Sequence, residues 1–256
     1  MIVAGSILFT ISLQGHKLHW TNFRFLPFTA LYGLSPAIAS FIVLKRNKEV
    51  SGIKEWLKNV FFVKTNILNY LLILFLLALQ VLRNVILVGM PLVAPFYMFF
   101  FFLPFMLIGG GMEEAGWRYI LQPQLEKKLG FIIAAVITGI IWAVWHLPFF
   151  FIPGTDQAGT DLFGFFLHCV FISFIYGAIV KIAEKAGVFL CVLFHTMNNV
   201  LNNALFFTNT TGFTWQLWVG SSVYYTFISI LSLILVLIYK QKKRMPNDPL
   251  TKPGFY

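Results

Sequence analysis

Long, almost uninterrupted apolar segments alternate with short polar segments along this chain. Most of the apolar segments approach the ~20 residues that an α-helix needs to cross a bilayer. Apolar and polar residues do not alternate strictly within them, as they would in the strands of a membrane β-barrel. The pattern therefore predicts an all-α, polytopic bundle of about eight transmembrane helices. The expected spans are roughly residues 2–14, 25–44, 67–88, 91–110, 131–152, 162–182, 187–207 and 217–239.

A single membrane domain, residues 1–240, is expected to make up nearly the whole chain, because no internal repeat and no second domain are visible. The first apolar segment, 2–14, is short and follows no basic stretch, so it is interpreted as a partial span rather than a secretory signal. Residues 241–256 are polar and hold three prolines, which predicts a disordered cytoplasmic tail.

Composition and charge agree with a membrane protein. The chain is 59% hydrophobic and only 11% charged, whereas soluble domains carry about 25% charged residues. Most basic residues lie in segments 45–66, 111–129 and 181–186 and in the tail after residue 239. Because cytoplasmic loops are rich in Lys and Arg, this bias predicts that both termini are cytoplasmic. It also explains the net charge of +10 without nucleic acid as a partner, and leaves membrane lipid as the expected one.

The polar segment 45–66 contains apolar residues at helical spacing against Lys54 and Lys58. These residues are Ile53, Trp56, Leu57, Val60 and Phe61. Two interpretations stay open for it, an amphipathic helix in the membrane interface and a solvated connecting helix.

Three motifs place ionisable or amide side chains inside apolar segments. Charged groups at membrane depth are costly and tend to mark function, so three such motifs in one small protein predict a functional site. Three glycines at 109–111 precede the first motif and are expected to break its helix. The motifs are Glu113-Glu114-x-x-x-Arg118, Trp142-x-x-x-His146 and His195-x-x-x-Asn199.

Spacing within the motifs predicts which groups act together. Glu114 and Arg118 are four residues apart, so they share a helix face and are expected to form a structural ion pair. Glu113 lies about 100° further around the helix, which leaves its carboxylate to face a cavity. His195 and Asn199 also share one face of their helix.

The first two motifs are expected to face each other across a helical hairpin. If helices 111–128 and 131–148 are joined by a turn at Gly130, Glu113 lies opposite His146. Each would then stand about 25 Å from the turn, at a rise of 1.5 Å per residue.

These groups are suited to hydrolysis in two ways. In the first, Glu113 and His146 hold and deprotonate a water molecule, while His195 and Asn199 donate hydrogen bonds to an oxyanion. In the second, Glu113, His146 and His195 bind one zinc ion and leave a position open for water. No H-E-x-x-H motif occurs, so an ordinary zincin is not expected. The residues alone leave open whether the cofactor is one zinc ion or none.

At these residues the sequence resembles the CPBP family of intramembrane proteases, also called the Abi or CAAX-protease family. Members of that family combine the motifs E-E-x-x-x-R, F-x-x-x-H and H-x-x-x-N/D in this order. The same order is found here over residues 113–199, inside a protease core at about 91–207. The departure is Trp142, which stands where the family motif has phenylalanine.

The resemblance implies an eight-helix membrane protease whose site is open to the cytosol. It implies that Glu113 and His146 activate water, that His195 and Asn199 stabilise the oxyanion, and that the substrate is a peptide or protein. Family members are commonly labelled metalloproteases, which keeps zinc as an alternative. Eukaryotic relatives trim prenylated C-terminal tripeptides, and bacterial relatives are associated with bacteriocin processing or self-immunity. The motifs resemble a bacterial variety, so the expected location is a bacterial plasma membrane.

Two other functions are compatible with a polar cluster in membrane helices. A non-catalytic immunity or scaffold protein would keep the protease fold and bind a peptide. A transporter would use the same Glu, Arg and His groups as a proton relay, but the sequence contains no inverted repeat. The complete set of three motifs favours the peptidase.

Overall fold

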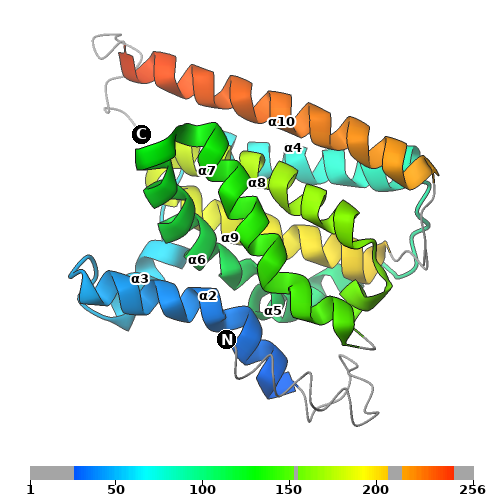
Figure 1. Ribbon diagram of the computed structural model, residues 1–256, viewed down its shortest axis with the longest axis horizontal. Helices are drawn as coiled ribbons and strands as arrows, with labels where there is room; N and C mark the ends of the chain where they lie inside the picture. The colour runs from blue at the N-terminus through cyan, green and yellow to red at the C-terminus, as the bar shows by residue number, and fades with distance from the viewer. Residues whose placement is uncertain (1–25, 153–154, 207–214, 245–256) are drawn as a thin grey trace.

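The computed structural model describes residues 26–152, 155–206 and 215–244 (Figure 1). The predicted span 2–14 and the tail from residue 245 onward lie outside the described residues. The described residues form helices and no sheet, which confirms the all-α class. The α-helices are α2 (Leu26–Arg46), α3 (Ile53–Phe61), α4 (Ile67–Leu82), α5 (Tyr97–Gly109), α6 (Glu114–Gly116), α7 (Gln122–His146), α8 (Leu162–Ala183), α9 (Gly187–Val200) and α10 (Trp215–Arg244).

Short helical segments of other types connect or extend the α-helices. Three of them are π-helical: η1 (Arg83–Leu87), η3 (Trp117–Leu121) and η7 (Leu201–Leu205). The 3-10 segments are η2 (Gly111–Glu113), η4 (Leu147–Phe151), η5 (Asp156–Gly159) and η6 (Glu184–Ala186).

Four stretches of the described chain are long and apolar enough to cross a membrane, by length and composition. They are Ile67–Leu87, Tyr97–Phe151, Leu162–Asn203 and Trp218–Lys243. The second and third stretches each contain two of the predicted spans, because short helical segments join consecutive helices without a long loop. The membrane helix bundle is confirmed, and the number of eight spans stays a prediction.

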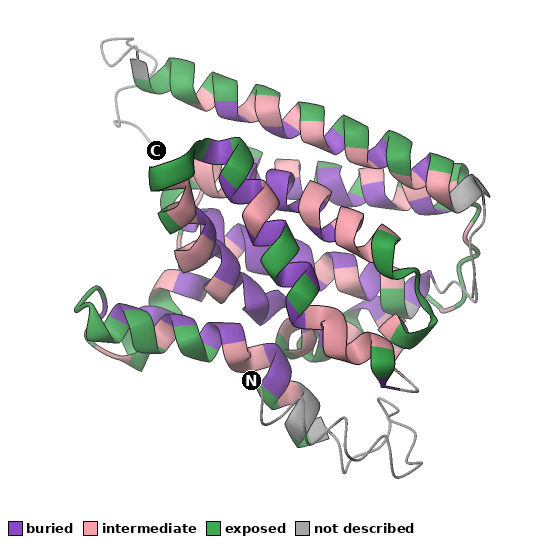
Figure 2. Cartoon of the chain, in the orientation of Figure 1, coloured by how far each residue is buried: buried purple, intermediate pink, exposed green. Residues whose placement is uncertain are grey.

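Helix α9 runs through the middle of the bundle and is buried over most of its length (Figure 2). It contacts α4, α5 and α8, while α2 and α10 lie at opposite edges of the molecule (Figure 1). A helix that is buried on every side can hold polar groups only where neighbouring helices supply partners. The polar residues of α9 therefore have to be matched by residues on the helices around it.

The glycines at 109–111 end α5 just before the first motif, as predicted. Gly109 is the last residue of α5, and Gly110 has φ −168° and ψ −53°, outside helical geometry. The chain resumes as the 3-10 turn η2, which ends at Glu113. The first motif thus begins at a break between two helical segments.

Helix α7 changes direction at Gly130, where the predicted hairpin has its turn. Gly130 has φ 76° and ψ 170°, a region that glycine enters without steric cost. The indole of Trp142, beyond the turn, reaches the carboxylate of Glu113, before it, at 2.7 Å. The two arms of the hairpin therefore run back beside each other.

Helix α3 packs against the bundle with part of its apolar face. Trp56 and Val60 are buried, and the Trp56 indole donates to the hydroxyl of Ser40 on α2 at 3.1 Å. Ile53 and Leu57 of the same helix are exposed. Part of the apolar face therefore contacts protein, and the interfacial and solvated interpretations of the helix both stay predictions.

The basic segments of α7, α8 and α10 meet at one end of the bundle. Lys181 near the end of α8 forms an ion pair with Glu126 of α7, and its ammonium lies 5.6 Å from the ring centroid of Tyr239. Lys243 lies 5.1 Å from the same ring. Basic segments that lie on the same side of a membrane should be found at the same end of the bundle, and these three segments are.

Candidate active site

The first motif lies in the interior of the bundle at the start of the hairpin. Glu113, Glu114 and Arg118 are 2%, 0% and 0% exposed. They come from η2, α6 and η3, three consecutive turns of different helical type. Buried charges require partners, and the two carboxylates find very different ones.

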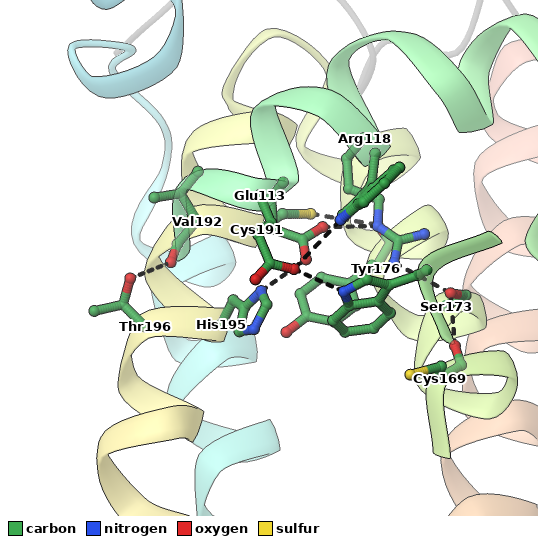
Figure 3. A network of polar contacts seen from close by, with 12 residues as sticks. Glu113, Arg118, Cys169, Ser173, Tyr176, Cys191, Val192, His195 and Thr196 are labelled. Carbon is green, nitrogen blue, oxygen red and sulfur yellow. Dashed lines mark hydrogen bonds and ion pairs between the residues drawn. The ribbon is translucent and has the colours of Figure 1, made fainter. Parts of the chain in front are cut away.

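Glu114 is held by two charged or polar groups, one on each oxygen; these partners, Arg118 and His195, are labelled in Figure 3. Its Oε2 accepts from Nε of Arg118 at 2.7 Å, which confirms the predicted pair. Its Oε1 lies 2.8 Å from Nδ1 of His195 on α9, a contact that the sequence did not predict. Glu114 therefore joins the first motif to the third.

Each nitrogen of the Arg118 guanidinium has a hydrogen-bond partner. It donates to Gln122 and, at 3.1 Å, to the hydroxyl of Ser173 on α8. Its central carbon lies 4.8 Å from the ring centroid of Tyr176, which adds a cation–π contact. Arg118 thus ties the hairpin to α8 and supports the structural role predicted for it.

Among the described residues, the hydrogen-bond partners of Glu113 are indoles and not cations. Its Oε2 accepts from the indole of Trp142 at 2.7 Å and from that of Trp117 at 3.4 Å. Within the described ranges, no hydrogen bond reaches its Oε1. One oxygen of Glu113 is therefore held in place and the other is available.

The geometry of His146 assigns its tautomer. Its Nδ1 lies 3.0 Å from the carbonyl oxygen of Trp142, and a carbonyl can only accept. Nδ1 therefore carries hydrogen, and in the neutral ring Nε2 presents a lone pair. Phe165 packs against the imidazole with a centroid distance of 5.0 Å. Between Glu113 and His146 themselves, both of which are described, no direct hydrogen bond is formed; each contacts Trp142.

His195 and Asn199 converge on the break before Glu113. A Cβ atom added to Gly110 would lie 3.2 Å from Nε2 of His195 and closer still to Nδ2 of Asn199. The carbonyl of Gly110 in turn accepts from the backbone N–H of Glu113 at 2.9 Å. Only a residue without a side chain fits here, so Gly110 lets both α9 groups approach the first motif.

The predicted zinc ligands do not form a metal site among the residues that the structure describes. No three His, Cys, Asp or Glu side chains are gathered there as one ligand set. Nδ1 of His195 is taken by Glu114, and Oε2 of Glu113 by Trp142. These contacts use one atom of each side chain and leave Oε1 of Glu113 and Nε2 of His195 without a hydrogen bond among the described residues, so the zinc set Glu113, His146 and His195 stays a prediction.

Several residues of the site were not predicted from the sequence. Trp117 is four residues after Glu113, so its position on the same helix face was available as a clue. Tyr32 of α2 donates to the carbonyl of Trp145, with ring centroids 4.2 Å apart, and has no motif around it. Thr196 occupies the space above Gly111, where a Cβ would collide with its hydroxyl.

Comparisons with known proteins agree with this arrangement. Residues 95–201 match the family described as type II CAAX prenyl endopeptidase Rce1-like, a range that includes all three motifs. The chain is similar to CAAX prenyl protease 2 of Methanococcus maripaludis, with 23% identity over 223 residues, 75% of this chain and 81% of that protein. It is also similar to lysostaphin resistance protein A of Staphylococcus haemolyticus, with 24% identity over 139 residues, 53% of this chain but only 36% of that protein. The motifs, the helix bundle and these matches together support a membrane protease of the CPBP family.

Proposed function

We propose that this protein is an intramembrane endopeptidase in which Glu113 and His146 activate water while His195 and Asn199 stabilise the oxyanion. The observation that carries the proposal is the contrast between the two neighbouring carboxylates. Both oxygens of Glu114 are engaged by Arg118 and His195, whereas the described part of the chain holds Glu113 through Oε2 alone. A buried carboxylate with one free oxygen is what a general base requires.

The proposed reaction moves one proton through Glu113. A water molecule donates to Oε1 of Glu113 and is oriented by the lone pair on Nε2 of His146. Glu113 takes a proton as the water oxygen attacks the peptide carbonyl. The oxyanion accepts from Nδ2 of Asn199, with Nε2 of His195 beside it at Gly110. Glu113 then gives its proton to the departing amine, and the peptide bond is cleaved into an acid and an amine.

We propose further that the protein lies in a bacterial plasma membrane with both termini in the cytoplasm. The meeting of Lys181 and Lys243 at one end of the bundle supports this orientation. The name of the archaeal relative, CAAX prenyl protease 2, makes a lipid-modified peptide with a CAAX terminus the first substrate to examine.

The test uses the full-length protein in liposomes with a farnesylated CAAX peptide as probe. Mass spectrometry of the products should reveal cleavage at one bond, unchanged by a zinc chelator. Metal content is measured in parallel for wild type and His195→Ala. Activity that chelation removes and zinc restores, with bound zinc that falls in His195→Ala, would instead make Glu113, His146 and His195 metal ligands.

A non-catalytic immunity protein is the second candidate, favoured by the likeness to lysostaphin resistance protein A. It would bind its peptide without hydrolysis, and wild type would leave farnesylated and unmodified probes intact. Cells that carry Glu113→Gln would then resist the bound peptide as well as cells that carry the wild-type protein. Loss of resistance in Glu113→Gln cells would return the assignment to the peptidase.

Substitution of Gly110 by alanine is expected to lower kcat/KM by about tenfold to a hundredfold. The new methyl group collides with Nδ2 of Asn199 and crowds Nε2 of His195, so the Asn199 donor is displaced rather than removed. Complete removal of one oxyanion donor costs about 10²–10³, and its displacement is expected to cost less. Gly52→Ala is the matched control, because a Cβ there meets nothing within 4 Å. Equal peptide cleavage by the two variants would contradict the role given to Gly110.

A further inference from the structure

We infer that Trp142 is a positioning residue for hydrolysis: its indole N–H holds Oε2 of Glu113, so that Oε1 is the atom that takes the proton from water. The inference rests on the proposed function of Glu113 as general base. It adds a residue whose counterpart in the family motif, phenylalanine, has no N–H to donate.

The strength of the contact follows from its length and surroundings. Nε1 of Trp142 lies 2.7 Å from Oε2 of Glu113, at the short end for a hydrogen bond from nitrogen to oxygen. Trp142 is 4% exposed and Glu113 is 2% exposed, so water competes little for either group. Hydrogen bonds to charged groups are the stronger ones in proteins, and the low dielectric of the interior strengthens them further.

The second indole on the same oxygen is a weaker partner. Nε1 of Trp117 lies 3.4 Å from Oε2 of Glu113, beyond the usual range of 2.7–3.2 Å. Both donors approach one oxygen, which keeps the carboxylate from rotating and presents Oε1 in a constant direction. Trp142 is the donor that sets this direction.

Trp142 also orients the other groups of the site. Its backbone carbonyl accepts from Nδ1 of His146 at 3.0 Å. Its ring lies edge-to-face against His195, with a centroid distance of 5.4 Å and an interplanar angle of 73°. One residue of α7 thus contacts Glu113, His146 and His195. Phenylalanine at 142 would keep the backbone contact with His146 but lose the indole N–H and part of the ring that packs against His195.

A matched control lies three residues further along the same helix. Trp145 is 5% exposed and packs against Tyr32, yet its indole N–H has no hydrogen-bond partner among the described residues. Phenylalanine at 145 therefore removes the same atoms as phenylalanine at 142 without removing a hydrogen bond. The comparison isolates the N–H contact with Glu113 from the loss of indole volume.

The experiment measures cleavage of the farnesylated CAAX peptide by Trp142→Phe, Trp117→Phe and Trp145→Phe in liposomes. For Trp142→Phe we expect kcat to fall about tenfold to a hundredfold with KM within about twofold of wild type, since a hydrogen bond to a charged group is worth about that factor. Trp117→Phe and Trp145→Phe should each lower kcat by less than about threefold, because the bond is long or absent.

An isostere separates the hydrogen bond from shape. Benzothienylalanine at position 142 has sulfur in place of the indole N–H and keeps the two rings. The loss of kcat seen in Trp142→Phe should recur in this variant at unchanged thermal stability. Wild-type kcat in the benzothienylalanine protein would overturn the inference, as would equal losses in Trp142→Phe and Trp145→Phe.

A spectroscopic measurement keeps the inference distinct from the proposed function. In protein labelled with ¹⁵N at tryptophan, Trp142→Phe identifies the indole resonance of Trp142. That resonance should shift when Glu113→Ala removes the acceptor, whether or not the probe is cleaved. An unchanged resonance would contradict the inference. Cleavage by Glu113→Gln would contradict the proposed function, and the spectrum would still test the hydrogen bond between Trp142 and Glu113.

Discussion

Replacement of Glu113 by glutamine is expected to lower kcat/KM for peptide cleavage by about 10²–10⁴, the range that a general base contributes. Glutamine has nearly the same size, and its amide oxygen can still accept the Trp142 indole at the position of Oε2. It cannot take a proton from water. The loss should therefore appear in kcat, while the protein inserts and folds like wild type.

Glu126→Gln provides the control for this change. Glu126 lies on the same helical hairpin at its far end, where it pairs with Lys181. Its neutralisation should leave cleavage of the farnesylated peptide unchanged. The assay is the initial rate in liposomes, normalised to the amount of folded protein. A Glu113→Gln protein that cleaves at the wild-type rate would remove Glu113 from the mechanism.

Breaking the Glu114–Arg118 pair is expected to have the largest effect on stability. Both side chains are fully buried and 2.7 Å apart, so removal of one leaves the other charge uncompensated, at a cost of about 3–5 kcal/mol. Arg118→Met should therefore lower the melting temperature in detergent by on the order of 10 °C. Arg118→Met also removes the donor to the side-chain oxygens of Gln122 and Ser173.

The double variant Glu114→Leu/Arg118→Met distinguishes charge from packing. With both charges gone, stability should recover part of the loss, because apolar replacement of a buried pair is often neutral or stabilising. Activity should not recover, since Nδ1 of His195 has lost its acceptor. Lys181→Met, which breaks the partly exposed pair with Glu126, should cost at most about 1 kcal/mol. A double variant less stable than Arg118→Met would contradict this account.

Local features of the site could be predicted from the sequence because they depend on helical spacing alone. The Glu114–Arg118 pair is an i,i+4 contact, and the helix break at Gly109–Gly111 and the turn at Gly130 follow from residues that favour non-helical geometry. The length of the apolar segments likewise predicted a membrane helix bundle.

The contact between Glu114 and His195 could not be predicted, because it depends on how α9 is rotated about its own axis. The two residues are 81 positions apart, and nothing in either motif states which of the adjacent carboxylates the histidine meets. The zinc set, which uses the other carboxylate, Glu113, was suggested by residue types alone and stays a prediction.

The indole donors were missed for a different reason. A tryptophan in an apolar segment is expected to contribute volume, and only the fold shows whether its N–H has an acceptor. The N–H of Trp142 has one, whereas that of Trp145 has none in the described chain.

Helix α3 poses a related difficulty. Lipid and protein interior both select apolar side chains, so the sequence could not separate the buried Trp56 from the exposed Ile53.

The short range of the Glu114–Arg118 contact has a consequence for biosynthesis. Both residues and Gln122 lie within nine positions of one another, so their side chains can meet in a single isolated helix. The nascent segment can therefore enter the bilayer with its charges already compensated, before α8 and α9 have been translated. His195 and Ser173 join only afterwards, and the candidate site is assembled when the last of these helices docks. A protein with the same residues spread over separate helices would expose a bare arginine to lipid during insertion.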